Sequence, residues 1–230
     1  MEDFRANGRN CNVVFPETPA AGGKWIWRAE FLGAFDTVDL DLLSKGYTLA
    51  CCQVHDLYGC PEAVEAMKSF HDLMTAHGFS EKTVIFGFSR GGLYACNYAL
   101  RYPGDIAVLY LDAPVLDIKS WPGGMMTGVG AAREFDECLA LYGLDRETVK
   151  DFRQNPVDRL GELLELKIPV ALVAGDSDRV VPYCENGKYL EEVYRNGGGD
   201  LLCIVKPGCD HHPHSLTDPA PVSGFITARY

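Results

Sequence analysis

Hydrophobic and polar positions form two kinds of pattern along the chain, continuous apolar runs and apolar residues at helical spacing. Short, nearly continuous apolar segments bounded by glycine, proline or charged residues are typical of strands buried in a sheet. Such segments predict strands at residues 11–17, 24–30, 47–54, 82–88, 106–113, 168–176 and 201–207. Apolar residues at helical spacing predict helices at 35–46, 61–78, from 89 onward, 183–196 and 219–228. Strands that alternate with helices predict an α/β fold, with a mostly parallel sheet and helices on both faces.

The pattern changes between residues 115 and 165. This stretch is richer in glycine and charge, and WPGGMMTGVG breaks it at 121–130. We expect a small helical cap, or lid, over the sheet rather than a second domain. The 230 residues then form one domain, a size that suits a single hydrophobic core.

Composition and charge narrow the classes of partner. The chain has 32 acidic and 21 basic residues, and its formal net charge of −11 disfavours nucleic acid and anionic membranes. It contains no apolar run long enough to cross a membrane. The nine cysteines are odd in number and lie mostly within apolar segments. This usage favours buried, reduced thiols of a cytoplasmic protein over a secreted disulfide framework.

A serine among glycines follows the strand expected at 82–88. The segment GFSRGG, residues 87–92, fits the pattern G-x-S-x-G around Ser89. In this pattern the serine lies on a tight strand-to-helix turn, and small neighbours let the strand and the helix approach each other. The start of the helix also places free amides beside the serine oxygen. Ser89 is therefore a candidate nucleophile, whereas the simpler interpretation is a helix N-cap.

Two carboxylates follow the strand expected at 168–176. A serine nucleophile needs a histidine base, and the base needs a carboxylate that fixes its tautomer. Asp176 lies close to the strand end, where aspartates commonly close turns. Asp178 lies deeper in the loop AGDSDRVVP and is the preferred candidate acid.

Three of the six histidines follow the last expected strand, in KPGCDHHPHSL. His211 is the candidate base, because it completes the chain order of nucleophile, acid and base. The side chain of His212 points away from His211 along an extended chain, since neighbouring side chains alternate. We expect His212 to hold the loop and His214, which follows Pro213, to cap or brace the final turn.

No metal or cofactor is expected. Asp210, His211, His212 and His214 could together form a competing metal site, but no further motif with metal ligands accompanies them. The chain has no G-x-G-x-x-G after its first expected strand and no P-loop. The predicted partner is a small-molecule substrate.

These segments together resemble the α/β-hydrolase superfamily over nearly the whole chain. Within it the chain is similar to small bacterial hydrolases that carry WIWRAEF, here 25–31, and HHPHSL, here 211–216. Those relatives are mostly described as esterases or prolyl-oligopeptidase-like hydrolases. The resemblance implies an α/β-hydrolase fold and a catalytic triad of Ser89, His211 and Asp178.

The chain departs from many other α/β-hydrolases at the end of the strand expected at 24–30, after Trp27. Many of them carry His-Gly there as part of the oxyanion hole, whereas this chain has Arg28, Ala29 and Glu30. The resemblance implies one backbone donor from Arg90, the residue after the nucleophile, and a second from Ala29 or Glu30. The charged side chains allow two interpretations. An Arg28–Glu30 ion pair, or pairs with partners elsewhere, would hold the loop in shape, or either side chain would bind polar groups of the substrate.

We expect a serine hydrolase that cleaves a small carboxylic ester through an acyl-enzyme. Trp27, Arg28 and Glu30 are weaker candidates for substrate binding, and together with Trp25 they favour an acylated carbohydrate. A peptidase or amidase of the same fold is one alternative. A non-catalytic, hydrolase-like binding protein is another, which the intact candidate triad disfavours.

Overall fold

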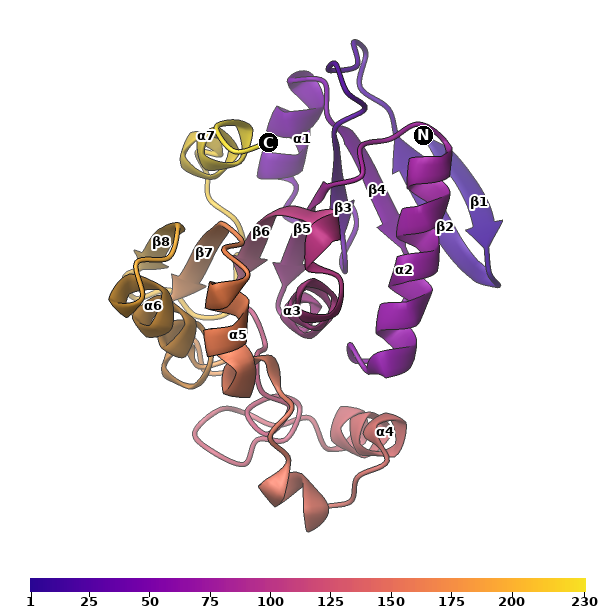
Figure 1. Cartoon of the computed structure of the whole chain (residues 1–230). Coiled ribbons are helices and arrows are strands. Elements are labelled where there is room, and N and C mark those ends of the chain that lie inside the picture. Colours follow the sequence, from indigo (N-terminus) through magenta and orange to yellow (C-terminus); the bar gives the residue numbers. More distant parts are fainter.

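The computed structural model describes residues 1–230 as an eight-stranded sheet between two layers of helices (Figure 1). The strands are β1 (Glu2–Ala6), β2 (Arg9–Val14), β3 (Trp25–Arg28), β4 (Thr48–Cys52), β5 (Thr83–Phe88), β6 (Ile106–Asp112), β7 (Val170–Gly175) and β8 (Leu201–Lys206). Their order across the sheet is β1-β2-β4-β3-β5-β6-β7-β8. β1 and β2, and β2 and β4, pair antiparallel. All other pairs are parallel, as predicted.

The sequence pattern did not predict β1. Its residues, EDFRA, are mostly polar and exposed, because the strand lies at the edge of the sheet and pairs only with β2. Charged side chains are common on edge strands, where they discourage pairing with other chains. The strand therefore lacks the apolar pattern that marks the buried ones.

The main helices are α1 (Thr37–Ser44), α2 (Pro61–Ala76), α3 (Gly91–Arg101), α4 (Ala132–Tyr142), α5 (Leu160–Glu165), α6 (Gly187–Asn196) and α7 (Ala220–Thr227). Helix α2 starts at Pro61, whose fixed φ suits a first helical position. Its apolar stripe, which includes Val64, Met67 and Phe70, is buried as the spacing predicted. Four single-turn 3-10 helices, at Pro103–Asp105, Thr148–Asp151, Pro156–Arg159 and Tyr183–Glu185, complete the set. No helix combines the length and the apolar character that crossing a membrane requires.

Each face of the sheet has its own apolar core. The larger cluster packs α2, α3, α5 and α6 on one face, with side chains such as Phe70, Tyr94 and Tyr194 fully or almost fully buried. The smaller cluster packs α1 and α7 on the other face, around Leu42, Phe86 and Ile226. Figure 1 shows these two layers on opposite sides of the sheet. The strands at the centre are therefore apolar on both sides, which is why they appear as continuous apolar runs in the sequence.

Residues 115–165, the expected cap, contain α4, two 3-10 helices and α5. Helix α4 lies apart from the sheet in Figure 1. A third apolar cluster joins Phe135 and Leu139 of α4 to Leu93 of α3 and to Val181, in the loop after β7. Helix α5 instead contributes Leu160 and Leu163 to the core of the sheet. Its residues therefore belong to the helical layer, and the excursion from the sheet ends before residue 160.

Candidate active site

Ser89 lies at the sharp turn between β5 and α3. Its φ of +48° is in the left-handed region, which is uncommon for a residue with a side chain. The turn is fixed by backbone hydrogen bonds. The Ser89 amide donates to the carbonyl of Asp112 at 2.9 Å, and the amide of Val115 donates to the Ser89 carbonyl at 2.8 Å. This turn presents the side chain at the carboxyl edge of the sheet.

Two glycines permit the close packing around this turn. A Cβ atom on Gly87 would lie 2.9 Å from the Cβ of Ala95, and one on Gly92 would lie 2.6 Å from the Cβ of Pro114. Gly91 is different, because a Cβ there would meet the Cβ of Glu30 at 3.4 Å, an ordinary contact. The tight approaches are therefore at Gly87 and Gly92.

Ser89, His211 and Asp178 form a continuous hydrogen-bonded chain. The Ser89 Oγ lies 2.9 Å from the His211 Nε2, and the His211 Nδ1 lies 2.7 Å from the Asp178 Oδ2. His211 and Asp178 are both 6% exposed. The three residues follow β5, β8 and β7 respectively, and parallel strands end at the same edge of the sheet. This arrangement can accept a proton from the serine and stabilise the charged imidazole that results.

The two aspartates of the β7 loop have different surroundings. The free oxygen of Asp178, Oδ1, accepts hydrogen bonds from the amides of Val180 and Val181, at 2.9 and 2.8 Å. Those bonds fix the carboxylate while its other oxygen contacts His211. Asp176 is exposed and accepts a hydrogen bond from the amide of Gly208 at 2.7 Å, which joins the loops after β7 and β8. Asp176 does not contact the histidines.

The residue before His211 anchors the histidine loop to the acid loop. Asp210 accepts hydrogen bonds from the Arg179 amide at 3.0 Å and from its guanidinium at 2.8 and 2.6 Å. It also accepts one from the His211 amide at 2.8 Å. The Arg179 amide, the His211 amide and the Arg179 side chain together lower the pKa of Asp210 to about 2. The carboxylate therefore stays charged, and the two loops stay joined, across the neutral pH range.

His212 and His214 both lie beside His211 but make different contacts. The expectation that His212 points away from His211 is wrong, because the centroids of their rings lie 4.9 Å apart. His214 is buried, and its Nδ1 lies 2.7 Å from the Oδ1 of Asp112, at the end of β6. The other oxygen of Asp112 accepts a hydrogen bond from the Ser215 amide at 2.8 Å. His212 is exposed and stacks on Phe35, with ring centroids 5.5 Å apart. The His214–Asp112 pair, which the sequence pattern did not predict, ties the histidine loop to the sheet.

Two backbone amides near Ser89 are free to bind a ligand. Neither the Arg90 amide nor the Glu30 amide donates to another group of the protein. The Ala29 amide, the alternative candidate for the second oxyanion donor, is not free. It donates to the carbonyl of Phe86 at 3.1 Å and so continues the sheet pairing.

The side chains of these same two residues pair with each other. Arg90 donates from Nε to the Glu30 Oε2 at 3.1 Å. The Glu30 side chain is 2% exposed, and its Oε1 has no hydrogen-bond partner. Burial raises the pKa of Glu30 to about 7, although the Arg90 charge acts in the opposite direction. Of the two structural alternatives, the Arg28–Glu30 pair does not form, and each side chain pairs with a partner elsewhere.

Arg28 and Trp27 are interior residues rather than substrate contacts. Arg28 is fully buried and donates from Nε and Nη2 to both oxygens of Asp39, at 2.6 and 2.7 Å. The same Nη2 donates to the carbonyls of Ala34 and Phe35, so Arg28 fixes the loop that leads to α1. Trp27 is also fully buried, and it stacks on the equally buried Trp25 at 5.5 Å between centroids. Of the residues that favoured an acylated carbohydrate, Trp25, Trp27 and Arg28 therefore face the core, whereas Glu30, 4% exposed, lines a cavity.

Solved structures share this arrangement of strands and helices. An α/β-hydrolase enzyme from the sediment metagenome of the Mar Chica lagoon, Morocco, superposes with a TM-score of 0.65 at 15% identity, covering 99% of this chain and 97% of its own. The chain has the α/β-hydrolase fold. A truncated carbohydrate esterase from gut microbiota superposes on this fold with a TM-score of 0.68 at 16% identity, covering 96% of this chain and 90% of its own.

A larger protein contains the same α/β-hydrolase fold. The puromycin-hydrolyzing peptidase of Mycobacterium tuberculosis superposes with a TM-score of 0.70 at 13% identity over 96% of this chain. The match covers 36% of the peptidase, so the chain spans about a third of its length. No protein-family model and no curated protein matches the chain. The comparisons therefore establish the fold alone.

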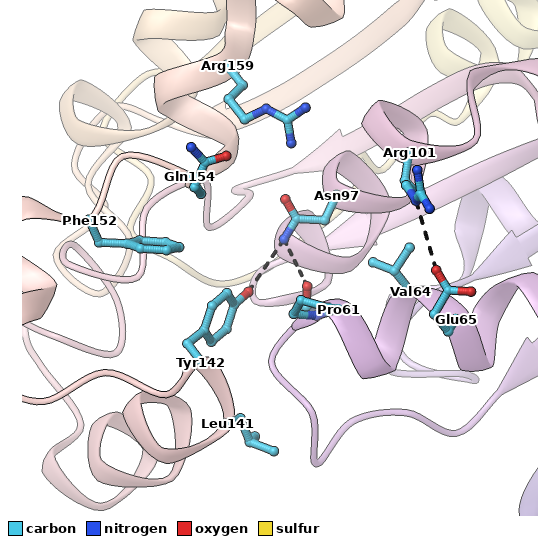
Figure 2. Close-up of a pocket in the computed structure, with 11 residues that line it drawn as sticks. Pro61, Val64, Glu65, Asn97, Arg101, Leu141, Tyr142, Phe152, Gln154 and Arg159 are labelled. Atoms are coloured by element: carbon cyan, nitrogen blue, oxygen red, sulfur yellow. Dashed lines mark hydrogen bonds and ion pairs between the residues drawn. The ribbon is translucent and has the colours of Figure 1, made fainter.

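Two cavities lie near the carboxyl edge of this α/β-hydrolase fold. One, of about 470 Å³, begins at the Glu30–Arg90 pair next to Ser89, and its wall includes Phe31, Leu32 and His55. Another, of about 380 Å³, lies between α2, α3 and the cap (Figure 2). Figure 2 shows the Asn97 amide hydrogen-bonded to the Tyr142 hydroxyl in its wall. Ser89, His211 and Asp178 line neither of the two cavities. The first cavity has Arg90, the residue after Ser89, in its wall.

Proposed function

We propose that the chain is a serine hydrolase that cleaves small carboxylic esters. The observation that carries this proposal is the hydrogen-bonded series from Ser89 Oγ through His211 to Asp178, at 2.9 and 2.7 Å. It lies beside two free backbone amides, those of Glu30 and Arg90. A nucleophile, a base, an orienting acid and oxyanion donors are the parts that acyl transfer requires.

The proposed reaction has two halves. His211 Nε2 accepts the Ser89 proton while Oγ bonds to the acyl carbon, and the Glu30 and Arg90 amides hold the oxyanion. The intermediate then expels the alcohol, which takes its proton from His211 and leaves an acyl-enzyme. Water, deprotonated by His211, attacks that acyl carbon, releases the acid and restores Ser89. Asp178 keeps the imidazole in the correct tautomer throughout.

The Glu30 carboxyl is compatible with this mechanism. A negative charge beside a forming oxyanion would oppose it. Here the Arg90 guanidinium pairs with the carboxyl, and burial raises the pKa of Glu30 to about 7, which favours its neutral form. Both effects reduce the repulsion at the proposed oxyanion hole.

The proposal places the enzyme in a reducing compartment, the cytoplasm, with a small molecule as its substrate. All nine cysteines are free, and six of them are buried. A protein stabilised by packing rather than by disulfides suits that environment. The cavity of about 470 Å³ that is lined in part by Glu30 and Arg90 is in the usual size range for a small-molecule site.

Hydrolysis assays distinguish the candidate activities. The purified chain should cleave short-chain 4-nitrophenyl esters faster than aminoacyl 4-nitroanilides, whereas the reverse order would indicate a peptidase. Ser89→Ala should lower turnover of the preferred substrate on the order of a millionfold, as loss of a triad nucleophile does in other serine hydrolases. A Ser89→Ala variant that keeps a tenth of wild-type turnover would exclude Ser89 as the nucleophile. No turnover of either substrate class would favour a binding protein.

A further inference from the structure

Three histidine rings gather at the edge of the sheet where the triad lies. His211, His212 and His214 each offer a ring nitrogen within 4.8 Å of those of the other two. The rings meet edge to face, with centroids 4.7 to 4.9 Å apart. Only His211 belongs to the proposed triad, so the reaction does not account for the grouping.

The rings of His211 and His214 each contact a carboxylate through Nδ1, as the rings of metal-binding histidines usually do. A histidine that binds a metal through one nitrogen commonly contacts a carboxylate through the other. The Nδ1 of His211 lies 2.7 Å from Asp178, and the Nδ1 of His214 lies 2.7 Å from Asp112. Each of these rings therefore has its Nε2 left as the ligand atom. The His211 Nε2 contacts only the Ser89 hydroxyl, and the His214 Nε2 makes no hydrogen bond to the protein.

The third ring is free to adjust. Neither ring nitrogen of His212 makes a hydrogen bond to the protein, and the side chain is exposed against Phe35.

The spacing is within reach of a single zinc ion. Zn–N bonds of about 2.0–2.1 Å place the nitrogens of a tetrahedral site roughly 3.3 Å apart. Closing a separation of up to 4.8 Å requires the nitrogens to approach each other by up to about 1.5 Å, and rotation of the exposed His212 ring can supply the part that involves His212. Three histidines with a fourth position for water or the Ser89 hydroxyl is a common zinc arrangement.

We propose that His211, His212 and His214 form an inhibitory site for a divalent transition metal such as Zn²⁺. The His211 Nε2 has one lone pair, which either accepts the Ser89 proton or binds the metal. A bound ion therefore removes the base from the triad. Metal binding itself is independent of the proposed hydrolase activity, whereas the inhibition rests on it.

Calorimetry with zinc chloride and the purified full-length chain tests the binding. We expect one zinc per chain. His212→Ala should weaken the zinc affinity at least about tenfold, because even the loss of a residue that only supports a metal ligand costs that much. The exposed His77, at the C-terminal end of α2, provides a matched control. His77→Ala should bind zinc as the wild type does. Cys209→Ser controls for the partly buried thiol two residues before His211.

Ester hydrolysis tests the inhibition. Zinc should inhibit the wild type reversibly, with recovery on addition of EDTA, and His212→Ala should hydrolyse esters at near wild-type rates with zinc present. Equal zinc affinity in the wild type and His212→Ala would overturn the site, as would loss of affinity in Cys209→Ser alone. Tight binding without inhibition would overturn the inhibitory role. If no ester is cleaved, the proposed function fails and calorimetry still decides the metal site.

Discussion

Arg90 donates a hydrogen bond from Nε to the Oε2 of Glu30 at 3.1 Å, and this pair joins the two chain segments that flank Ser89. Glu30 follows β3, and Arg90 follows Ser89 at the start of α3. The backbone amides of both residues are free. The same two residues thus supply the proposed oxyanion donors, and the hydrogen bond between their side chains links the two segments that carry those donors.

Glu30→Gln should change how stability depends on pH. A carboxyl whose pKa is raised in the folded state stabilises the fold below its unfolded pKa, and this contribution is lost as pH rises through the folded value. For Glu30 the interval runs from about 4.5 to about 7. The glutamine variant does not titrate. Between pH 5 and pH 8, its free energy of unfolding should therefore rise relative to wild type by roughly 3 kcal/mol at most.

Urea denaturation at several pH values measures this difference. The exposed Glu165 provides the control, because Glu165→Gln should follow the wild-type curve at every pH. Parallel curves for wild type and Glu30→Gln would mean that Glu30 titrates normally and that its burial has no electrostatic cost.

Asp178→Asn should reduce turnover by roughly ten-thousandfold, because an amide favours the wrong tautomer of His211. Asp176→Asn is the matched control. Asp176 contacts the Gly208 amide and not the histidine, so its replacement should mainly lower the melting temperature. Steady-state kinetics and thermal denaturation of both variants make the comparison. The larger kinetic loss in Asp176→Asn would transfer the role of the acid to that residue.

His211→Ala should lose as much turnover as Ser89→Ala, whereas His214→Ala should mainly lose stability. His214 forms a buried pair with Asp112, and removing one partner of such a pair costs roughly 3 kcal/mol or more. His212→Ala should change neither property much, because the ring is exposed and makes no hydrogen bond. Kinetics on the folded fraction, with denaturation curves, separate the three. Abolished activity in His212→Ala with activity kept in His211→Ala would move the base by one residue.

The sequence pattern predicted the elements whose side chains are uniformly buried or regularly amphipathic. β5, β6 and β7 are buried along their whole length, and each was predicted within two residues of its bounds. The positions of Ser89, Asp178 and His211 after three parallel strands followed from the fold class, since such strands end at one edge. The hydrogen bonds among the three residues could be predicted from the requirements of a serine nucleophile, which needs a base and an orienting carboxylate.

The contacts of the charged residues could not be predicted in the same way. Arg28 was expected to shape the loop through an ion pair or to bind the substrate. It is instead fully buried against Asp39, eleven residues later, which neutralises its charge. The pairs Glu30–Arg90 and His214–Asp112 join residues 60 and 102 positions apart. Such pairings depend on how the strands are ordered in the sheet, and no local periodicity records that order.

Labelling with a fluorophosphonate probe tests the central claim most directly, because the probe reacts with an activated serine and needs no knowledge of the substrate. Intact wild-type protein should gain a single adduct, and mass spectrometry of its peptides should place that adduct on Ser89. Ser89→Ala should gain none, and His211→Ala should react far more slowly. No adduct on the folded wild type, or an adduct on a different serine, would contradict the account.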